Sequence, residues 1–304
     1  MGRVLRRTVI KSLVVAGGTA ALGACTTAPA PRAQPTAQPA PSEPATSKPA
    51  TRKPATGKPA PAGTAPARSF AVRTEKLSLA RGADRPLPTT IWRPDAGGTF
   101  PLILFSHGIE ATPENYADLL TPWARAGFIV AAPKYPHTAA GVAEFNPIDL
   151  VNQPADAGYV ITQLAKRGVG PIAAAGHSGG GITTLGLFAG NRDARLRAGV
   201  ILAGRQIVQT PLTGASTPLL FVHGKRDRTV AYADGHAVYD DVTWPKAFLT
   251  VTDGGHVSTG PELRVIAATS TDFLRWSLYG DAAAKKRLPR DATRGGLATL
   301  ANRL

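Results

Sequence analysis

The sequence predicts an α/β fold in which a doubly wound, mostly parallel sheet carries helices on both faces. The first observation is that short apolar runs alternate with longer segments of helical spacing from residue 87 to residue 279. The second is that these runs are continuously apolar, as in parallel strands buried on both faces. The third is size, because residues 69–304 number 236, enough for one large domain with an ample core.

Seven apolar runs have the length of buried strands. In chain order they are 87–92, 102–105, 128–132, 172–175, 199–203, 219–222 and 247–251. Because helical segments separate them, we expect the strands to run parallel, with ligand-binding groups at their carboxyl ends.

Five intervening segments have helical spacing: 114–126, 154–167, 181–189, 231–240 and 261–279. Two of them carry apolar stripes, formed by Leu119, Leu120, Trp123 and Ala124 in the first and by Phe273, Trp276 and Leu278 in the last. Stripes at this spacing are more typical of core packing than of ligand contacts. We therefore expect both helices to pack against the sheet.

The pentapeptide Gly176-His177-Ser178-Gly179-Gly180 stands between a predicted strand and a predicted helix. A serine becomes a useful nucleophile when it projects from a sharp strand-to-helix turn, where only small residues fit two positions to either side. Gly176 and Gly180 meet that requirement. The alternative is a glycine-rich turn with an N-capping serine, in a chain that has 32 glycines. The flanking strand and helix favour the nucleophile.

A serine nucleophile needs a histidine base and a carboxylate that orients it, in the chain order Ser, Asp or Glu, His for this architecture. Asp227 follows the strand 219–222, and His256 follows the strand 247–251. Both therefore project from loops at the same sheet edge as Ser178. Asp253 is a rival acid, but in a Gly-rich turn three residues before His256 we expect it to cap that turn.

The oxyanion of a tetrahedral intermediate needs two backbone donors. One predicted donor is the amide of Gly179, directly after the nucleophile. The other is the amide of Ile109, in the loop after the strand 102–105. No pair of histidines has the spacing of metal ligands, so no metal is predicted. Acyl transfer from an ester to water on Ser178 needs no cofactor, and none is expected.

Several motifs occur in an order that resembles a known superfamily. They are Arg85-Pro86-Leu87-Pro88, Trp92-Arg93-Pro94, Phe105-Ser106-His107-Gly108, Pro154-Ala155-Asp156, the pentapeptide 176–180, His223-Gly224 with Asp227, and Gly255-His256. Residues 85–280 resemble the α/β-hydrolases, near bacterial dienelactone hydrolases, platelet-activating-factor acetylhydrolases and cutinase-like polyester hydrolases. The resemblance implies the α/β-hydrolase fold and ester chemistry on the serine.

Three positions differ from the polyester hydrolases, which usually carry an aromatic residue, a methionine and a tryptophan where this sequence has Ile109, Gly179 and residues 203–205. The segment between the strands 199–203 and 219–222 is too short for a helical cap domain. We therefore expect no large cap and an open cleft, in which Ile109, Ile207 and Trp244 lie near the acyl part of an ester.

Residues 1–25 are expected to be a lipoprotein export signal. Basic residues precede the charge-free apolar stretch 12–24, which is too short to span a bilayer. Residues 6–11 resemble a twin-arginine motif, although general secretion stays open, and residues 22–25 resemble a lipobox that ends at Cys25. Cys25 is the only cysteine. We expect it to carry a lipid anchor on the outer face of the bacterial cell membrane.

Residues 26–68 are almost entirely Pro, Ala, Thr, Ser, Gly and basic residues, so they are expected to form a disordered linker before the domain 69–304. Of 35 basic and 20 acidic residues in the chain, residues 1–68 hold ten and one. The domain itself is therefore only +6. No nucleic-acid-binding motif is present, and the basic linker suits anionic lipid or wall polymer better.

Together these features predict an exported serine esterase that acts on a small-molecule or lipid ester through an acyl-enzyme on Ser178. Two catalytic alternatives remain open: acyl transfer to a cell-envelope acceptor and cutinase-like polyester hydrolysis. A third alternative is a non-catalytic envelope-binding lipoprotein that keeps the fold.

Overall fold

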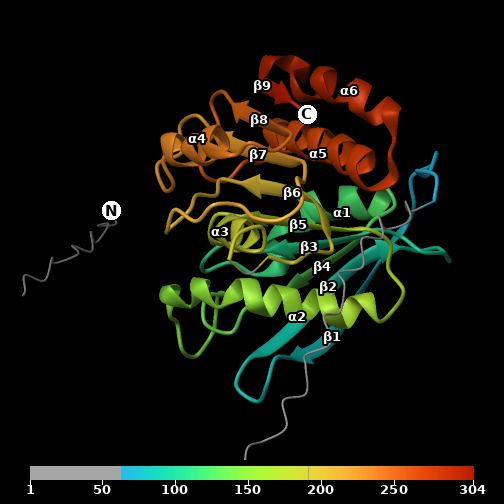
Figure 1. Cartoon of the computed structure of the whole chain (residues 1–304). Helices are drawn as coiled ribbons and strands as arrows, with labels where there is room; N and C mark the ends of the chain where they lie inside the picture. Colours follow the sequence, from blue (N-terminus) through green and yellow to red (C-terminus); the bar gives the residue numbers. More distant parts are fainter. Residues whose placement is uncertain (1–62, 191) are drawn as a thin grey trace, which may run out of the picture. The chain divides into compact units, whose positions relative to one another are not determined.

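Nine strands form one sheet in the order β1-β2-β4-β3-β5-β6-β7-β8-β9 (Figure 1). This computed structural model describes residues 63–190 and 192–304. The six central strands, β4 to β8 in spatial order, run parallel, whereas β1, β2 and β9 are antiparallel to their neighbours. The predicted doubly wound, mostly parallel sheet of an α/β-hydrolase fold is confirmed.

The strands are β1 Val72–Ala80, β2 Pro86–Pro94, β3 Leu102–Ser106, β4 Ile129–Pro133, β5 Ile172–His177, β6 Leu196–Leu202, β7 Leu219–Gly224, β8 Lys246–Val251 and β9 Ala298–Arg303. The α-helices are α1 Ala117–Arg125, α2 Gln153–Ala165, α3 Gly179–Gly186, α4 Tyr232–Asp241, α5 Gly260–Leu274 and α6 Ala282–Ala292. Short helical turns are η1 Pro113–Tyr116, η2 Pro147–Val151, η3 Arg275–Tyr279 and η4 Arg294–Gly296.

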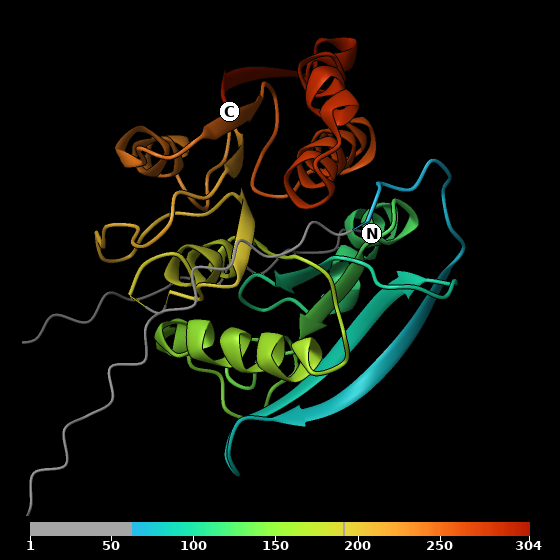
Figure 2. The same ribbon diagram turned by 45° about the vertical axis from the view of Figure 1, so that its right-hand side comes forward.

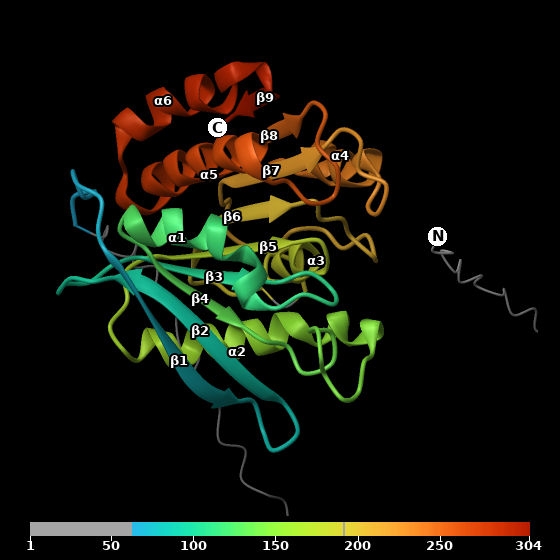
Figure 3. The same cartoon turned by 180° about the vertical axis from the view of Figure 1, so that it is seen from behind.

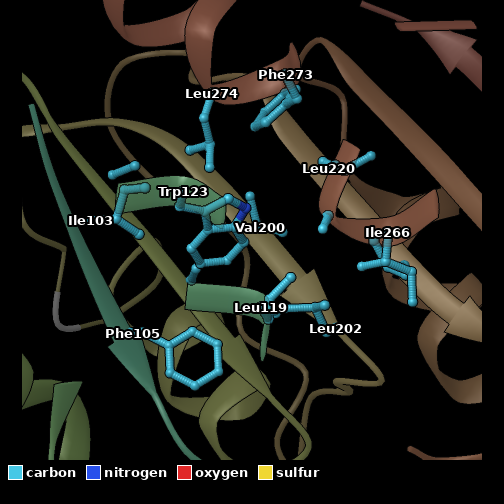
Figure 4. Packing of buried hydrophobic residues seen from close by; sticks show 14 of the residues in the cluster. Ile103, Phe105, Leu119, Trp123, Val200, Leu202, Leu220, Ile266, Phe273 and Leu274 are labelled. Atoms are coloured by element: carbon cyan, nitrogen blue, oxygen red, sulfur yellow. The ribbon is translucent and has the colours of Figure 1, made fainter. Parts of the chain in front are cut away.

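Helices cover both faces of the sheet and bury a separate apolar layer on each. Figure 2 shows α2, α3 and α4 on one side and α1, α5 and α6 on the other. On the second side, Trp123 of α1 is fully buried among side chains of the sheet and α5 (Figure 4). Its indole N–H donates to Ser270 Oγ at 2.9 Å, so the one polar atom of this ring is satisfied inside the core.

A buried ion-pair cluster fixes the segment before α2. The Arg85 guanidinium, in the turn between β1 and β2, donates to Asp149 of η2 at 2.7 and 2.9 Å and to Asp156 of α2 at 2.9 Å. Burial alone would raise the pKa of Asp149, but the Arg85 and Asn152 hydrogen bonds hold this pKa below its ordinary value. The cluster therefore holds η2 beside the carboxyl edge of the sheet.

Two strands and one α-helix were not expected from the sequence, namely β1, β9 and α6, and neither were the short turns η2 and η4. The run 87–92 was expected in a parallel sheet, but it lies in β2, which pairs antiparallel with β1 and β4. Residues 203–218, between β6 and β7, contain no helix or strand. This described segment therefore contains no large cap domain, as the sequence predicted.

The export signal, Cys25 and residues 26–62 of the expected linker lie outside the described residues. The last residues assigned to that linker contact the domain, since the Pro66 carbonyl oxygen accepts two hydrogen bonds of 3.0 Å from Arg275. Among residues 63–190 and 192–304, no helix has both the length and the apolar character needed to cross a membrane.

Candidate active site

Ser178 lies at the sharp turn between β5 and α3. Its φ of 57° and ψ of −119° are unusual for a residue with a side chain. A Cβ on Gly180 would overlap the Ser106 carbonyl oxygen, and one on Gly176 would overlap the Gly180 carbonyl oxygen. The Ser178 amide donates to the Leu202 carbonyl oxygen at 2.9 Å, which holds the turn against β6. Glycine at both flanking positions is therefore what allows this turn to pack so closely.

Asp227 and His256 meet at the carboxyl edge of the sheet. Asp227 follows β7, His256 follows β8, and His256 Nδ1 lies 2.8 Å from Asp227 Oδ2. The loop that carries His256 packs onto Gly224, where a Cβ would overlap the carbonyl oxygens of residues 254 and 255. Gly224 thus lets this loop approach the end of β7, beside Asp227.

The Asp227 carboxylate is held in its ionised form. Burial alone would raise the pKa of Asp227, but hydrogen bonds from His256 and from the amides of Val230 and Thr229 outweigh it and lower this pKa. His223 Nε2 also lies 3.2 Å from Oδ2. An ionised carboxylate at Nδ1 fixes the His256 tautomer that leaves Nε2 free to accept a proton.

The rival acid Asp253 lies elsewhere. Its carboxylate pairs with Arg226 at 2.6 Å, and both side chains are largely exposed. The structure therefore brings Asp227, and not Asp253, to His256.

The two amides predicted to hold an oxyanion lie on facing segments. A Cβ on Gly179 would be 3.4 Å from the Ile109 amide nitrogen. Gly179 is the first residue of α3, so its N–H has no acceptor within the helix. Across the described ranges, the Ile109 N–H also donates to no other group. Both donors are thus available next to Ser178.

Buried hydrogen bonds shape the loop that carries Ile109. His107 Nδ1–H donates to the Gly108 carbonyl oxygen at 2.8 Å, and His107 Nε2 accepts from the Tyr135 amide at 3.1 Å. Burial lowers the pKa of His107 to about 4, so the ring stays neutral and can do both. The Glu110 amide donates to Thr138 at 2.7 Å, in a left-handed backbone conformation at φ 55°.

Comparison with known proteins gives the family. The model of the chlorophyllase family matches residues 62–218, just over half of the chain. The chain belongs to the chlorophyllase family. It is 27% identical over 245 residues to chlorophyllase type 0 of Chenopodium album, an alignment that covers 67% of this chain and 68% of that relative. The family is of the α/β-hydrolase type, so the resemblance is confirmed at the level of the superfamily, though not of the bacterial branch.

The chlorophyllase match spans β1 to β6, with Ile109, Ser178 and Gly179, and it ends before Asp227 and His256. The placement of Asp227 beside His256 in this chlorophyllase-family chain therefore comes from its own geometry.

In the described part of the chain, no hydrogen bond joins the Ser178 hydroxyl to His256. Such bonds are often long in unliganded enzymes and tighten when substrate binds.

A series of hydrogen bonds that was not predicted from the sequence joins the oxyanion loop at Gly108 to the loop that carries His256. The Gly108 amide donates to the Tyr116 hydroxyl at 3.0 Å, which lies 2.9 Å from His177 Nδ1. His177 Nε2 lies 2.7 Å from the carbonyl oxygen of His256. A single arrangement satisfies all three contacts: Tyr116 donates to Nδ1, and Nε2–H donates to His256.

The protonation states of His177 and Tyr116 support that arrangement of hydrogen bonds. Burial lowers the pKa of His177 to about 4, which keeps the ring neutral. Burial also raises the pKa of the Tyr116 phenol, so the hydroxyl keeps its proton and can donate it. His177 occupies the variable position of the pentapeptide, and Tyr116 precedes an ordinary helix. Neither residue therefore carried a sequence signal for this contact.

A cavity of about 210 Å³ lies beside His256, with walls from α1, α5 and the ends of β6 to β8. Its apolar side chains include Leu119, Leu263 and Ile266. Within the described ranges, no group of His, Cys, Asp and Glu side chains is arranged to hold a metal ion.

The expectation that Trp244 lies in the cleft is wrong. Trp244 precedes β8, at the amino edge of the parallel strands, where it packs against Phe188 and under Arg192. Ile207 does lie in the loop after β6, at the carboxyl edge, and is exposed. A tryptophan at the start of a strand looks the same in sequence as one beside a cleft, because only the strand direction separates the two.

Proposed function

We propose that this chlorophyllase-family protein hydrolyses carboxylic esters through an acyl-enzyme on Ser178. The observation that carries the proposal is the 2.8 Å contact between His256 Nδ1 and Asp227, at the same sheet edge as the strained turn of Ser178. A histidine oriented by a carboxylate next to such a serine is the arrangement that activates a hydroxyl nucleophile.

In the first half of the reaction, Ser178 Oγ attacks the ester carbonyl carbon while His256 Nε2 takes the hydroxyl proton. The amides of Ile109 and Gly179 stabilise the oxyanion, to which one such donor contributes about 3 to 4 kcal/mol. When the carbon–oxygen bond to the alcohol breaks, His256 returns the proton to the leaving alkoxide.

In the second half, His256 takes a proton from water as the water oxygen attacks the acyl carbon. The acid leaves and Ser178 regains its proton. Asp227 keeps its charge throughout and stabilises the imidazolium form of His256.

Covalent labelling tests this proposal. A fluorophosphonate probe should form one adduct with the full chain, and peptide mass spectrometry should locate it on Ser178. The His256→Ala variant should label far more slowly, because the hydroxyl loses its base. The same preparation should release free acid from a short-chain nitrophenyl ester. No labelling of Ser178 in folded protein would support the alternative of a non-catalytic lipoprotein.

The bonds through Tyr116 support a positioning role for Tyr116 and His177. Replacing Tyr116 by Phe removes the group that joins the Gly108 amide to His177. We expect kcat for a short-chain ester to fall roughly tenfold, with a smaller change in KM, because a lost hydrogen bond of about 1 to 1.5 kcal/mol acts on the placement of the oxyanion loop and of His256. Steady-state kinetics measures this split.

The matched control is Tyr159→Phe on α2, on the opposite face of the sheet, which should leave kcat within about twofold. An equal loss of kcat in both variants, or a Tyr116→Phe loss explained entirely by unfolding in thermal melts, would contradict the positioning role.

Export and lipid anchoring at Cys25 are part of the same proposal. The lipobox-like residues 22–25 and the Pro/Ala-rich segment that follows support an enzyme tethered outside the cell membrane. In a host that acylates lipoproteins, the Cys25→Ser chain should leave the membrane fraction. Persistence of its membrane association through an uncleaved signal would argue against the anchor.

A further inference from the structure

The large apolar side chains that are most exposed all lie at one edge of the sheet. In the part of the chain that the structure describes they are Phe145, Ile148, Val151, Ile207, Val208 and Val257, between 48 and 75% exposed. They occupy only the segments that follow β4, β6 and β8. These strands are parallel, so their carboxyl ends meet at the edge toward which β6 points in Figures 1 and 3. We call these six residues the apolar rim.

The rim is continuous with the candidate active site. Leu150, between two rim residues of η2, lies against Gly179, beside the nucleophile. Val257 directly follows His256 and lines the same cavity. The loop with Ile207 follows β6, the strand next to β5. The three rim segments therefore lie around the turn that carries Ser178.

Single exposed apolar residues are common on any protein surface and need no explanation. What is unusual is their confinement, because the other surfaces of the described domain carry no comparable side chain. The buried ion pairs of Arg85 hold η2 in this place. The exposure of Ile148 and Val151 therefore belongs to a fixed segment.

Position and reach favour a lipid surface as the occupant. A protein partner or a second copy on the rim would close Ser178 off from substrate, whereas a lipid surface would deliver apolar esters to it. The expected anchor, Cys25, lies 38 residues before residue 63. A proline-rich chain of that length reaches at most roughly 120 Å at about 3.1 Å per residue. The tether is long enough for this edge of the domain to turn toward the membrane.

The charged side chains on the same edge are compatible with that surface. Exposed basic residues on these loops are Arg205, Lys225, Arg226 and Arg228, and exposed acids are Glu110, Glu114, Glu144 and Asp253. Two further acids on these loops, Asp149 and Asp227, are buried and hydrogen-bonded. The exposed basic and acidic side chains on these loops are equal in number, so the apolar side chains, and not a net charge, carry the adsorption.

We propose that the apolar rim adsorbs the domain to a lipid surface, from which the ester substrate enters the Ser178 site. The adsorption stands on the rim alone. The delivery of substrate rests on the proposed function.

Vesicle binding tests the adsorption without the anchor. The chain without the expected signal, residues 25–304 with Cys25→Ser, is mixed with phosphatidylcholine–phosphatidylglycerol vesicles and sedimented. We expect it to bind, and the additional changes Ile148→Ser and Val208→Ser to weaken the partition coefficient by at least about tenfold. The matched control, Val169→Ser, removes a partly exposed apolar side chain at the opposite edge, before β5, and should bind as strongly as its parent.

Two results would overturn the proposal. One is equal binding by the rim variant and its parent, with thermal melts showing both folded. The other is a concentration-dependent dimer of the parent that the rim variant abolishes, since this would assign the rim to a second copy.

Hydrolysis of a water-soluble nitrophenyl ester is measured in parallel. Rim-dependent binding without hydrolysis would leave the adsorption in place and refute the esterase.

Discussion

The Ser178→Ala variant is expected to lose about 10^6 in kcat on a short-chain nitrophenyl ester. In the proposed mechanism the Ser178 hydroxyl forms the acyl-enzyme, and alanine leaves the two predicted oxyanion donors in place. The variant should fold normally, because the strained backbone at φ 57° is held by the glycines and the Leu202 hydrogen bond and not by the serine side chain. Initial rates, corrected for trace contaminating esterase by phosphonate titration, give the loss.

Ser258 provides the matched comparison for this variant. It lies two residues after His256 and is partly exposed, so it is the other serine near the base. Ser258→Ala should keep its activity within about threefold. Full activity in purified Ser178→Ala, or a severe loss in Ser258→Ala alone, would refute Ser178 as the nucleophile.

The Asp227→Asn variant is expected to lose about 10^4 in kcat. Asparagine keeps the shape of the side chain, but an amide offers His256 Nδ1 no negative charge and favours the wrong tautomer. The other carboxylate oxygen, Asp227 Oδ1, accepts hydrogen bonds from the amides of Thr229 and Val230 at 2.8 and 2.9 Å. An asparagine oxygen can still accept them, so the turn should survive. Steady-state kinetics and thermal melts on the same preparation separate the two effects.

Asp253→Asn is the control that distinguishes the two acids. It removes a charge three residues from His256, but from a carboxylate that pairs with Arg226 on the surface. An exposed pair of this kind contributes little, so activity should stay within about threefold. A larger loss in Asp253→Asn than in Asp227→Asn would reverse the assignment.

The parallel centre of the fold was predictable because its strands are continuously apolar, as in 102–105 and 219–222. The edges were not. β1 is the segment VRTEKLSLA, with charged and polar residues on an exposed strand, and β9 is the similarly polar ATLANR. Helix α6 contains Pro289, and Leu288 is its one large apolar residue. Edge elements bury little surface, so their sequences carry little of the hydrophobic pattern on which such predictions depend.

The candidate site divides in the same way. Ser178, Asp227 and His256 follow from chain order and from their positions after strands, and the structure brings the last two into contact. The role of Tyr116 was not predictable, because its partners Gly108 and His177 are joined only through the fold. Trp244 was wrongly expected in the cleft because a large aromatic side chain is typical of a binding site. It precedes β8 and therefore lies at the amino edge of the sheet, opposite Ser178.

Strand β9 has a practical consequence for handling this protein. It pairs along the whole of β8, and the amide of Thr252, where the loop toward His256 begins, donates to the Leu297 carbonyl oxygen just before β9. Leu304, directly after β9, is itself partly buried against the core. Strand β9 is therefore a structural support of the loop that carries His256. Deleting β9 is expected to displace His256, although this strand lies far from Ser178 in sequence.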